Sequence, residues 1–283
     1  MAELPADAHL GAIRLRVGDG ERLQRFYEEA IGLRSLGGKD GVTALGVDAG
    51  EPLVELEADP DAPPRPPHTT GLFHLALLVP TRADLARALR RVVAIGWRLS
   101  GASDHLVSEA LYLSDPEGNG IELYRDRPRD EWPAAAGMLR MDTLPLDLGS
   151  LLSEDDGADG DNGMPSGTAL GHVHLQVADL APAEAFWVEA LGFDVTVRGY
   201  PGALFVSTGG YHHHVGLNTW AGVGAPRPPA GAQGLMRFEL VLPNAAAVES
   251  ASDRLAASGT PIELADEGVL ASDPSGNTVL VRS

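Results

Sequence analysis

The chain of 283 residues repeats itself, and this repetition constrains its fold more than any other feature. Ile13–Val17, followed by Arg25–Leu33, matches Val173–Val177, followed by Ala185–Phe193. In both copies an alternating apolar pattern ends at a valine, and then an aromatic pair, an alanine and a glycine follow at the same spacing. The alternation predicts a strand, and the aromatic stretch predicts a helix that ends at the glycine.

A second pair of segments also matches. Leu72–Pro80 leads to Leu113–Leu123, and Met236–Pro243 leads to Ala271–Val281. Each copy predicts a strand, a helix and then an Asp-Pro-x-Gly-Asn turn between two further strands. Because Asp-Pro and Gly-Asn are strong turn signals, a hairpin is expected at each of these turns. The two helices are predicted at residues 82–95 and 245–257.

The chain therefore contains four modules, each predicted as a strand, a helix and several strands. They cover about residues 9–58, 68–125, 169–220 and 232–283. The segment between the second and third modules differs, since it is charged and ends in an acidic, glycine-rich run that cannot bury a core. We expect an N-terminal domain at 9–125, an acidic linker at 126–168 and a C-terminal domain at 169–283.

Composition excludes several classes of function. The chain has no cysteine, so disulfides, thiolate metal sites and cysteine nucleophiles are excluded, and any metal needs nitrogen and oxygen ligands. A net charge of −19 would repel phosphate backbones, so no nucleic-acid partner is expected. No apolar run reaches the roughly 18 residues of a membrane span, and the N-terminus has no secretion signal. We expect a cytoplasmic protein without a membrane partner; homo-oligomerisation is left open.

The four modules, with Asp-Pro-x-Gly-Asn-x-x-Glu closing the second, resemble the vicinal-oxygen-chelate superfamily. That superfamily contains glyoxalase I, bleomycin- and fosfomycin-resistance proteins and extradiol dioxygenases. Ser108–Tyr124 and Gly209–Trp220 are similar to the two-domain bacterial catechol 2,3-dioxygenase type. The resemblance covers the chain except the predicted linker. It implies an α+β fold in which four βαβββ modules form two cup-shaped mixed-sheet halves.

The resemblance also implies where a metal binds, because ligands in this superfamily lie in the first and last strands of a module. His74, Glu122 and His172 occupy such places. His174 is an alternative to His172, since it points to the same face of its strand. Two imidazoles and one carboxylate suit iron(II), with manganese, nickel or zinc as alternatives. In the first module the corresponding places hold Ala12, which cannot bind metal, and Glu55 in the last strand, which is left open as a ligand. In the fourth module they hold Arg237 and Leu280, neither of which is a ligand.

Because these ligands come from the second and third modules, those two must pair around one cup, and the first must pair with the fourth. Glyoxalase I uses four ligands, and Ala12 removes one of them here. The ligand number therefore favours an oxygenase.

Three further residues are candidates for catalysis. His212–His214 closes the third module, and strand alternation would place the first and last of these histidines on one face. By resemblance His214 matches the family's acid–base histidine, and imidazole can transfer protons near neutral pH. Tyr112, ten residues before Glu122, matches a tyrosine that contacts the substrate oxygen. His105 is expected in a loop near the same mouth, as a substrate contact.

The resemblance thus implies an iron(II)-dependent extradiol dioxygenase of aromatic catabolism, acting on a small catechol-like diol with O2. One alternative is a glyoxalase-type metal-dependent lyase or isomerase, which would work without oxygen. Another is a resistance protein that binds a small molecule on the same fold, in which case the metal ligands would be dispensable.

Overall fold

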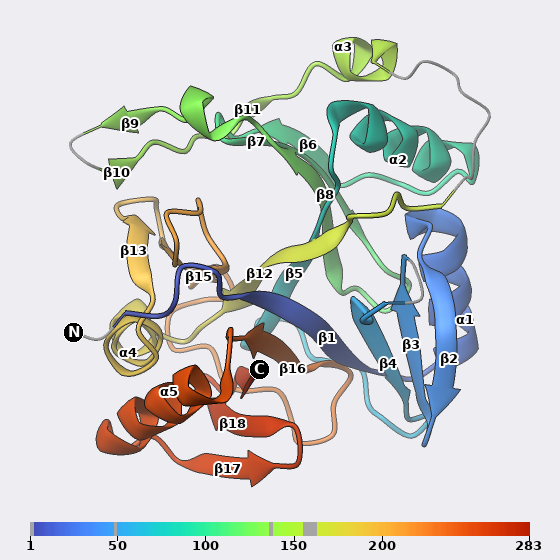
Figure 1. Ribbon diagram of the computed structural model, residues 1–283. Coiled ribbons are helices and arrows are strands. Elements are labelled where there is room, and N and C mark those ends of the chain that lie inside the picture. The colour runs from blue at the N-terminus through green and yellow to red at the C-terminus, as the bar shows by residue number, and fades with distance from the viewer. Residues whose placement is uncertain (1–2, 48–49, 136–137, 155–162) are drawn as a thin grey trace. The chain divides into compact units, whose positions relative to one another are not determined.

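The repeat predicted from the sequence is present as four successive βαβββ modules in a computed structural model that describes residues 3–47, 50–135, 138–154 and 163–283 (Figure 1). In the first and third modules the helix continues into a π-helical turn. The first module comprises β1 (His9–Val17), α1 (Gly20–Phe26), η1 (Tyr27–Ile31), β2 (Arg34–Lys39), β3 (Val42–Gly46) and β4 (Val54–Ala58). The second comprises β5 (Gly71–Leu78), α2 (Arg82–Ala94), β6 (Gly101–Asp104), β7 (Ser108–Ser114) and β8 (Gly120–Asp126).

The third and fourth modules follow the same order of elements. The third comprises β12 (Ala169–Gln176), α4 (Leu180–Glu184), η3 (Ala185–Ala190), β13 (Asp194–Val197), β14 (Ala203–Ser207) and β15 (Val215–Asn218). The fourth comprises β16 (Gly234–Val241), α5 (Ala245–Ala257), β17 (Ile262–Ala265), β18 (Gly268–Ser272) and β19 (Thr278–Arg282). A side-chain cap starts each α-helix, and the clearest is the capping box of Thr81 and Asp84 on α2.

Two curved mixed sheets carry these modules. The hydrogen-bonded strand order is β17-β18-β19-β16-β1-β4-β3-β2 in one sheet and β11-β6-β7-β8-β5-β12-β15-β14-β13 in the other. The first sheet holds strands of the first and fourth modules, and the second holds strands of the second and third. The predicted α+β class, with two cup-shaped mixed-sheet halves and this exchanged pairing of modules, is confirmed.

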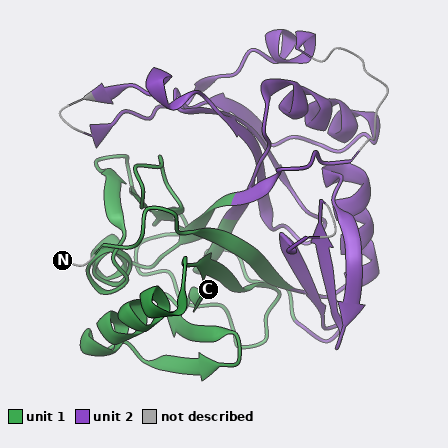
Figure 2. Ribbon diagram, viewed as in Figure 1, with its two compact units in different colours: residues 1–15, 63–73, 171–283 green, residues 16–62, 74–170 purple. Residues whose placement is uncertain are grey.

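The chain separates into two compact units (Figure 2). Unit 1 contains residues 1–15, 63–73 and 171–283, and unit 2 contains residues 16–62 and 74–170. Unit 1 therefore holds most of β1 and the third and fourth modules, whereas unit 2 holds the rest of the first module and the second. The predicted domain boundaries at residues 125 and 169 stay predictions.

Part of the predicted linker is folded within unit 2. Leu151 is fully buried, and β11 pairs with β6 through Leu144 and Asp104. Arg82 contacts Ser150 and Glu154. Residues 155–162, which hold most of the acidic run, lie outside the described residues. The elements in this segment are η2 (Arg129–Glu131), β9 (Ala134–Ala135), β10 (Met138–Leu139), β11 (Leu144–Pro145) and α3 (Leu148–Ser153).

Each Asp-Pro-x-Gly-Asn turn also contacts the aromatic helix of the other module in its unit. In unit 2 the Tyr27 hydroxyl donates to Asp115 Oδ2 over 3.4 Å. In unit 1 Trp187 Nε1 donates to Asp273 Oδ2 over 3.3 Å. Burial raises the pKa of both carboxyl groups, although hydrogen bonds from the turn's own asparagine oppose this rise. Each turn therefore connects adjacent strands and also joins two modules whose strands belong to different sheets.

Candidate metal centre

The local structure of unit 2 brings His74 and Glu122 together. Their strands, β5 and β8, are parallel neighbours, and Ala76 lies directly opposite Glu122 in the register. His74, two residues before Ala76, therefore projects from the same face as Glu122. His74 Nε2 lies 3.0 Å from Glu122 Oε2, and both side chains are buried. Because burying a carboxylate without a partner costs free energy, the contact with His74 stabilises Glu122 in this buried position.

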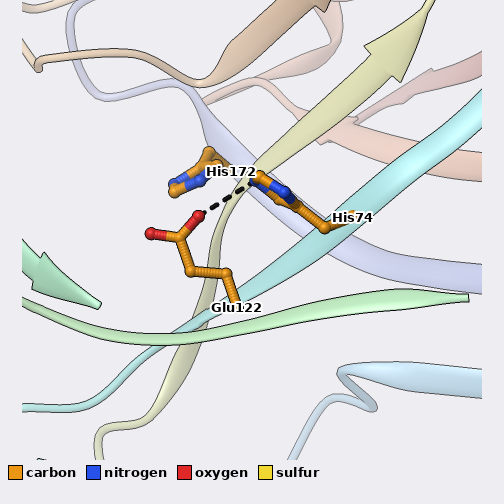
Figure 3. Close-up of side chains that lie close together, drawn as sticks. All are labelled: His74, Glu122 and His172. Atoms are coloured by element: carbon orange, nitrogen blue, oxygen red, sulfur yellow. Dashed lines mark ion pairs between the residues drawn. The ribbon is translucent and has the colours of Figure 1, made fainter. Parts of the chain in front are cut away.

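His172, on β12, completes a three-residue group. One ligand atom of each of His74, Glu122 and His172 lies within 4.8 Å of the others (Figure 3). Among the described residues this is the group of histidine and carboxylate side chains able to hold a metal ion. His174, the alternative ligand, has Phe73 and Trp220 as ring neighbours, at centroid distances of 5.3 and 5.2 Å.

The chemistry of this group fits a divalent metal. Two ligand atoms at about 2.1 Å from one ion, at a right angle, lie roughly 3 Å apart, which agrees with the His74–Glu122 distance. The nitrogen and oxygen donors suit iron(II), manganese(II), nickel(II) or zinc(II). The group therefore could hold a metal, and its composition does not select which one.

Tyr112 and His105 form a hydrogen-bonded pair in unit 2, next to His74 and Glu122. Tyr112 lies opposite Glu122 in the β7–β8 register, and its ring centroid is 5.7 Å from that of His74. His105 Nε2 lies 2.7 Å from the Tyr112 hydroxyl, and His105 Nδ1 lies 2.8 Å from the Asp142 carbonyl oxygen. Since a carbonyl only accepts, Nδ1 carries a proton, and in the neutral ring Nε2 accepts from the Tyr112 hydroxyl.

The histidine run in unit 1 differs in detail from its expected geometry. The backbone bends at His212 and His214, before β15 begins at Val215, so strand alternation does not apply to residues 212–214. The ring of His213 lies 4.2 Å from that of His172, and the ring of His212 lies 5.9 Å from it. His214 Nδ1 lies 2.7 Å from Ser207 Oγ and accepts a longer bond from Thr208 N–H. Because Nδ1 accepts this bond, the proton of a neutral His214 ring lies on Nε2.

Two contributors to the site could not be found from the sequence. Asp142 acts through its backbone carbonyl, and it lies in the predicted linker, where no periodicity marks it. Ser207 is a small polar residue at the end of β14, and only its contact with His214 distinguishes it. Alternation along β14 would have indicated its face, but not its partner.

This fold and this ligand group define a class of protein. The family model of the Glyoxalase/Bleomycin resistance protein/Dioxygenase superfamily matches residues 9–123 and 169–281, and the chain belongs to that superfamily. The resemblance inferred from the repeat is thereby confirmed.

Particular relatives are close in sequence or in fold. The chain is 42% identical to a catechol-2,3-dioxygenase of Bacillus subtilis (strain 168) over 278 residues, which cover 97% of this chain and 96% of the relative. A solved protein of Bacillus subtilis subsp. subtilis strain 168, provisionally named a dioxygenase, matches with a TM-score of 0.68 and 14% identity over 99% of this chain and 86% of that one. Glyoxalase I of Zea mays matches with a TM-score of 0.60 and 17% identity, over 97% and 92%. The two solved structures support the fold alone.

In the described parts of the chain, no helix has both the length and the apolar character needed to cross a membrane.

Proposed function

We propose that this protein is an iron(II)-dependent extradiol dioxygenase that cleaves a catechol-like ring with O2, acting in the cytoplasm in aromatic catabolism. The observation that carries the proposal is the buried His74–Glu122–His172 group in a chain 42% identical to a catechol-2,3-dioxygenase. These three residues would hold the metal. When bound, iron(II) supplies Lewis-acid and redox chemistry for the reaction of the diol with O2.

The protein's own residues would bind the diol and move its protons. Tyr112 donates its hydroxyl proton to His105, so its oxygen can accept a hydrogen bond from a substrate hydroxyl. His105 would then take up a proton through Tyr112, since its other ring nitrogen is fixed by the Asp142 carbonyl. This pair would orient the substrate and help to remove its proton.

His214 is proposed as the second proton-transfer residue, acting when the ring-opened product needs a proton. Ser207 and Thr208 hold Nδ1, so proton exchange would occur at Nε2. All three histidines of the run are buried, which would exclude water from reactive species. His213, which packs on His172, would instead fix the orientation of that ligand.

The test is oxygen uptake by anaerobically purified protein loaded with iron(II) and supplied with catechol. We expect one O2 consumed per catechol and a yellow ring-fission product, with activity and bound iron lost together in His74→Ala. His9→Ala, at an exposed histidine, is the matched control and should keep both.

Bound iron without oxygen uptake, across a panel of catechols, would reject the dioxygenase and leave the glyoxalase-type alternative. Full binding of a small molecule by a metal-free His74→Ala protein would favour the resistance-type alternative.

A further inference from the structure

The two long helices, α2 in unit 2 and α5 in unit 1, end in equivalent ways. Trp97 is the third residue after α2, and Thr260 is the third residue after α5. The backbone N–H of Trp97 donates to Val92 O over 3.0 Å, and that of Thr260 donates to Leu255 O over 3.1 Å. Each bond reaches back five residues, so Trp97 and Thr260 occupy equivalent positions in the two copies.

In unit 2 the indole of Trp97 packs into its surroundings through two contacts. Its ring lies 4.7 Å from that of Phe26, and its Nε1 donates to the Ser114 carbonyl over 3.0 Å. Ser114 directly precedes Asp115 of the Asp-Pro-x-Gly-Asn turn. The planar indole of Trp97 is therefore held by an aromatic wall, Phe26, and by a carbonyl acceptor, that of Ser114.

In unit 1 the same wall and acceptor are present, but the ring is not. Phe186 corresponds to Phe26, Ser272 corresponds to Ser114, and the small Thr260 replaces Trp97. These three residues line a pocket of about 1110 Å³ whose other lining residues come largely from α4, η3, β17 and β18. A pocket of this size is large enough for a small-molecule ligand.

We propose that this pocket binds a planar aromatic molecule that carries an N–H or O–H donor, of the indole class, in the position that Trp97 fills in unit 2. The donor would bond to the Ser272 carbonyl, and the ring would pack against the edge of Phe186 and the side chains around Thr260. Three acidic residues line the pocket (Glu189, Glu263 and Asp273) against one cation, Arg227, so a neutral or cationic ligand is favoured over an anion. The site shares no residue with the candidate metal centre and does not depend on the proposed function.

Indole itself is the probe, and the indole N–H signals of the protein's four tryptophans are the readout. Trp187 bonds to Asp273, which lines the pocket, so its signal should move on indole addition. The signals of Trp97, Trp132 and Trp220 should stay in place. No shift of Trp187 up to the solubility limit of indole would overturn the proposal. So would a shift confined to Trp220, which lies beside His174.

Substitution at the equivalent positions gives a matched set. Thr260→Trp fills the pocket with the protein's own indole and should weaken indole binding at least about tenfold, whereas Thr260→Ser should bind as the unmodified protein does. Trp97→Thr recreates the pocket in unit 2, and this variant should bind a second equivalent of indole. If Thr260→Trp fails to fold, Ala185→Trp, on the exposed wall of the pocket, replaces it. Unchanged binding in folded filling variants would refute the assignment.

Discussion

The hydrogen bond between His105 and Tyr112 makes a quantitative prediction about turnover. The Tyr112 hydroxyl and His105 Nε2 lie 2.7 Å apart, and both residues are half-buried. If they act as one unit on the substrate proton, removing either should remove the same contribution. A strong hydrogen bond in such a site contributes roughly 2 kcal/mol, which corresponds to about a 30-fold loss of kcat.

The perturbation is a double-mutant cycle of Tyr112→Phe and His105→Ala. Each single variant is expected to lose about 30-fold in kcat, and the double variant to lose little more than either one. Independent roles would instead multiply the two losses to about 1000-fold. The coupling energy expected from the cycle is therefore roughly 2 kcal/mol, because the loss in the double variant is smaller than the sum of the two single losses by about that amount.

The assay is oxygen uptake with catechol at saturating concentrations, normalised to bound iron so that metal loss is not counted as loss of turnover. Tyr27→Phe is the matched control, because it also removes a hydrogen-bonded tyrosine hydroxyl. The Tyr27 hydroxyl bonds to the Asp115 carboxylate and lies outside the proposed site. It should leave kcat unchanged. Additive effects of the two substitutions, or a loss in Tyr27→Phe of the same size, would refute the proposed relay.

Arg91→Met removes donors to the carbonyls of Ala30, Ile31 and Gly163, so it should lower the unfolding free energy by about 3 kcal/mol and the melting midpoint by roughly 5 °C. Arg254→Met removes a donor to the Leu191 carbonyl and should lower the unfolding free energy by less. Burial raises the pKa of Asp273 in the folded state, so the stability that this carboxyl contributes is full below the unfolded pKa of about 4 and is lost as pH rises through the folded pKa. In urea titrations the difference in unfolding free energy between the unmodified protein and Asp273→Asn should therefore change with pH across that window. A difference that does not change with pH would contradict this prediction. Chelation should abolish oxygen uptake, iron(II) should restore it, and zinc(II) should bind without restoring it, as metal analysis and the oxygen electrode would show.

Most of the fold could be predicted because the repeat carries its own signals. Strand alternation, the glycine that ends each aromatic helix and the Asp-Pro-x-Gly-Asn turns all depend on neighbours in the sequence. His74 and Glu122 could be predicted because the superfamily resemblance implies ligands in the first and last strands of a module, and the repeat locates those strands. Their 3.0 Å contact follows from the parallel pairing of those strands.

The rest depends on contacts between distant segments, which local patterns do not encode. His212–His214 was expected to continue a strand, but the backbone bends there, and the rings project in directions that alternation cannot give. The role of the two turn aspartates is similar: the turn signal predicts a hairpin, but not that Asp115 accepts from Tyr27, 88 residues earlier in the sequence. Residue 142 contacts His105 through its backbone carbonyl, which every residue type has, so the sequence could not predict this contact.

The fourth module shows what has replaced metal ligands in the other copy. Arg237 stands where the second module has His74, and it forms an ion pair of 2.8 Å with Glu267. Leu280 stands where that module has Glu122, and it is fully buried on β19, opposite Glu239 of β16. One position has thus become part of a surface ion pair, and the other has become part of the apolar core.

These replacements predict that a metal site cannot be restored in unit 1 by one change. Leu280→Glu would bury a carboxylate beside Glu239, so we expect it to lower the unfolding free energy by about 4 kcal/mol at neutral pH. The loss should shrink in acid, because burial and the like charge both raise the pKa of the new carboxyl group in the folded state. Adding zinc(II) should not restore stability, since Ala12 and Arg237 offer no ligand. Stabilisation of Leu280→Glu by zinc(II) beyond that of the unmodified protein would show that the fourth module keeps a latent ligand set.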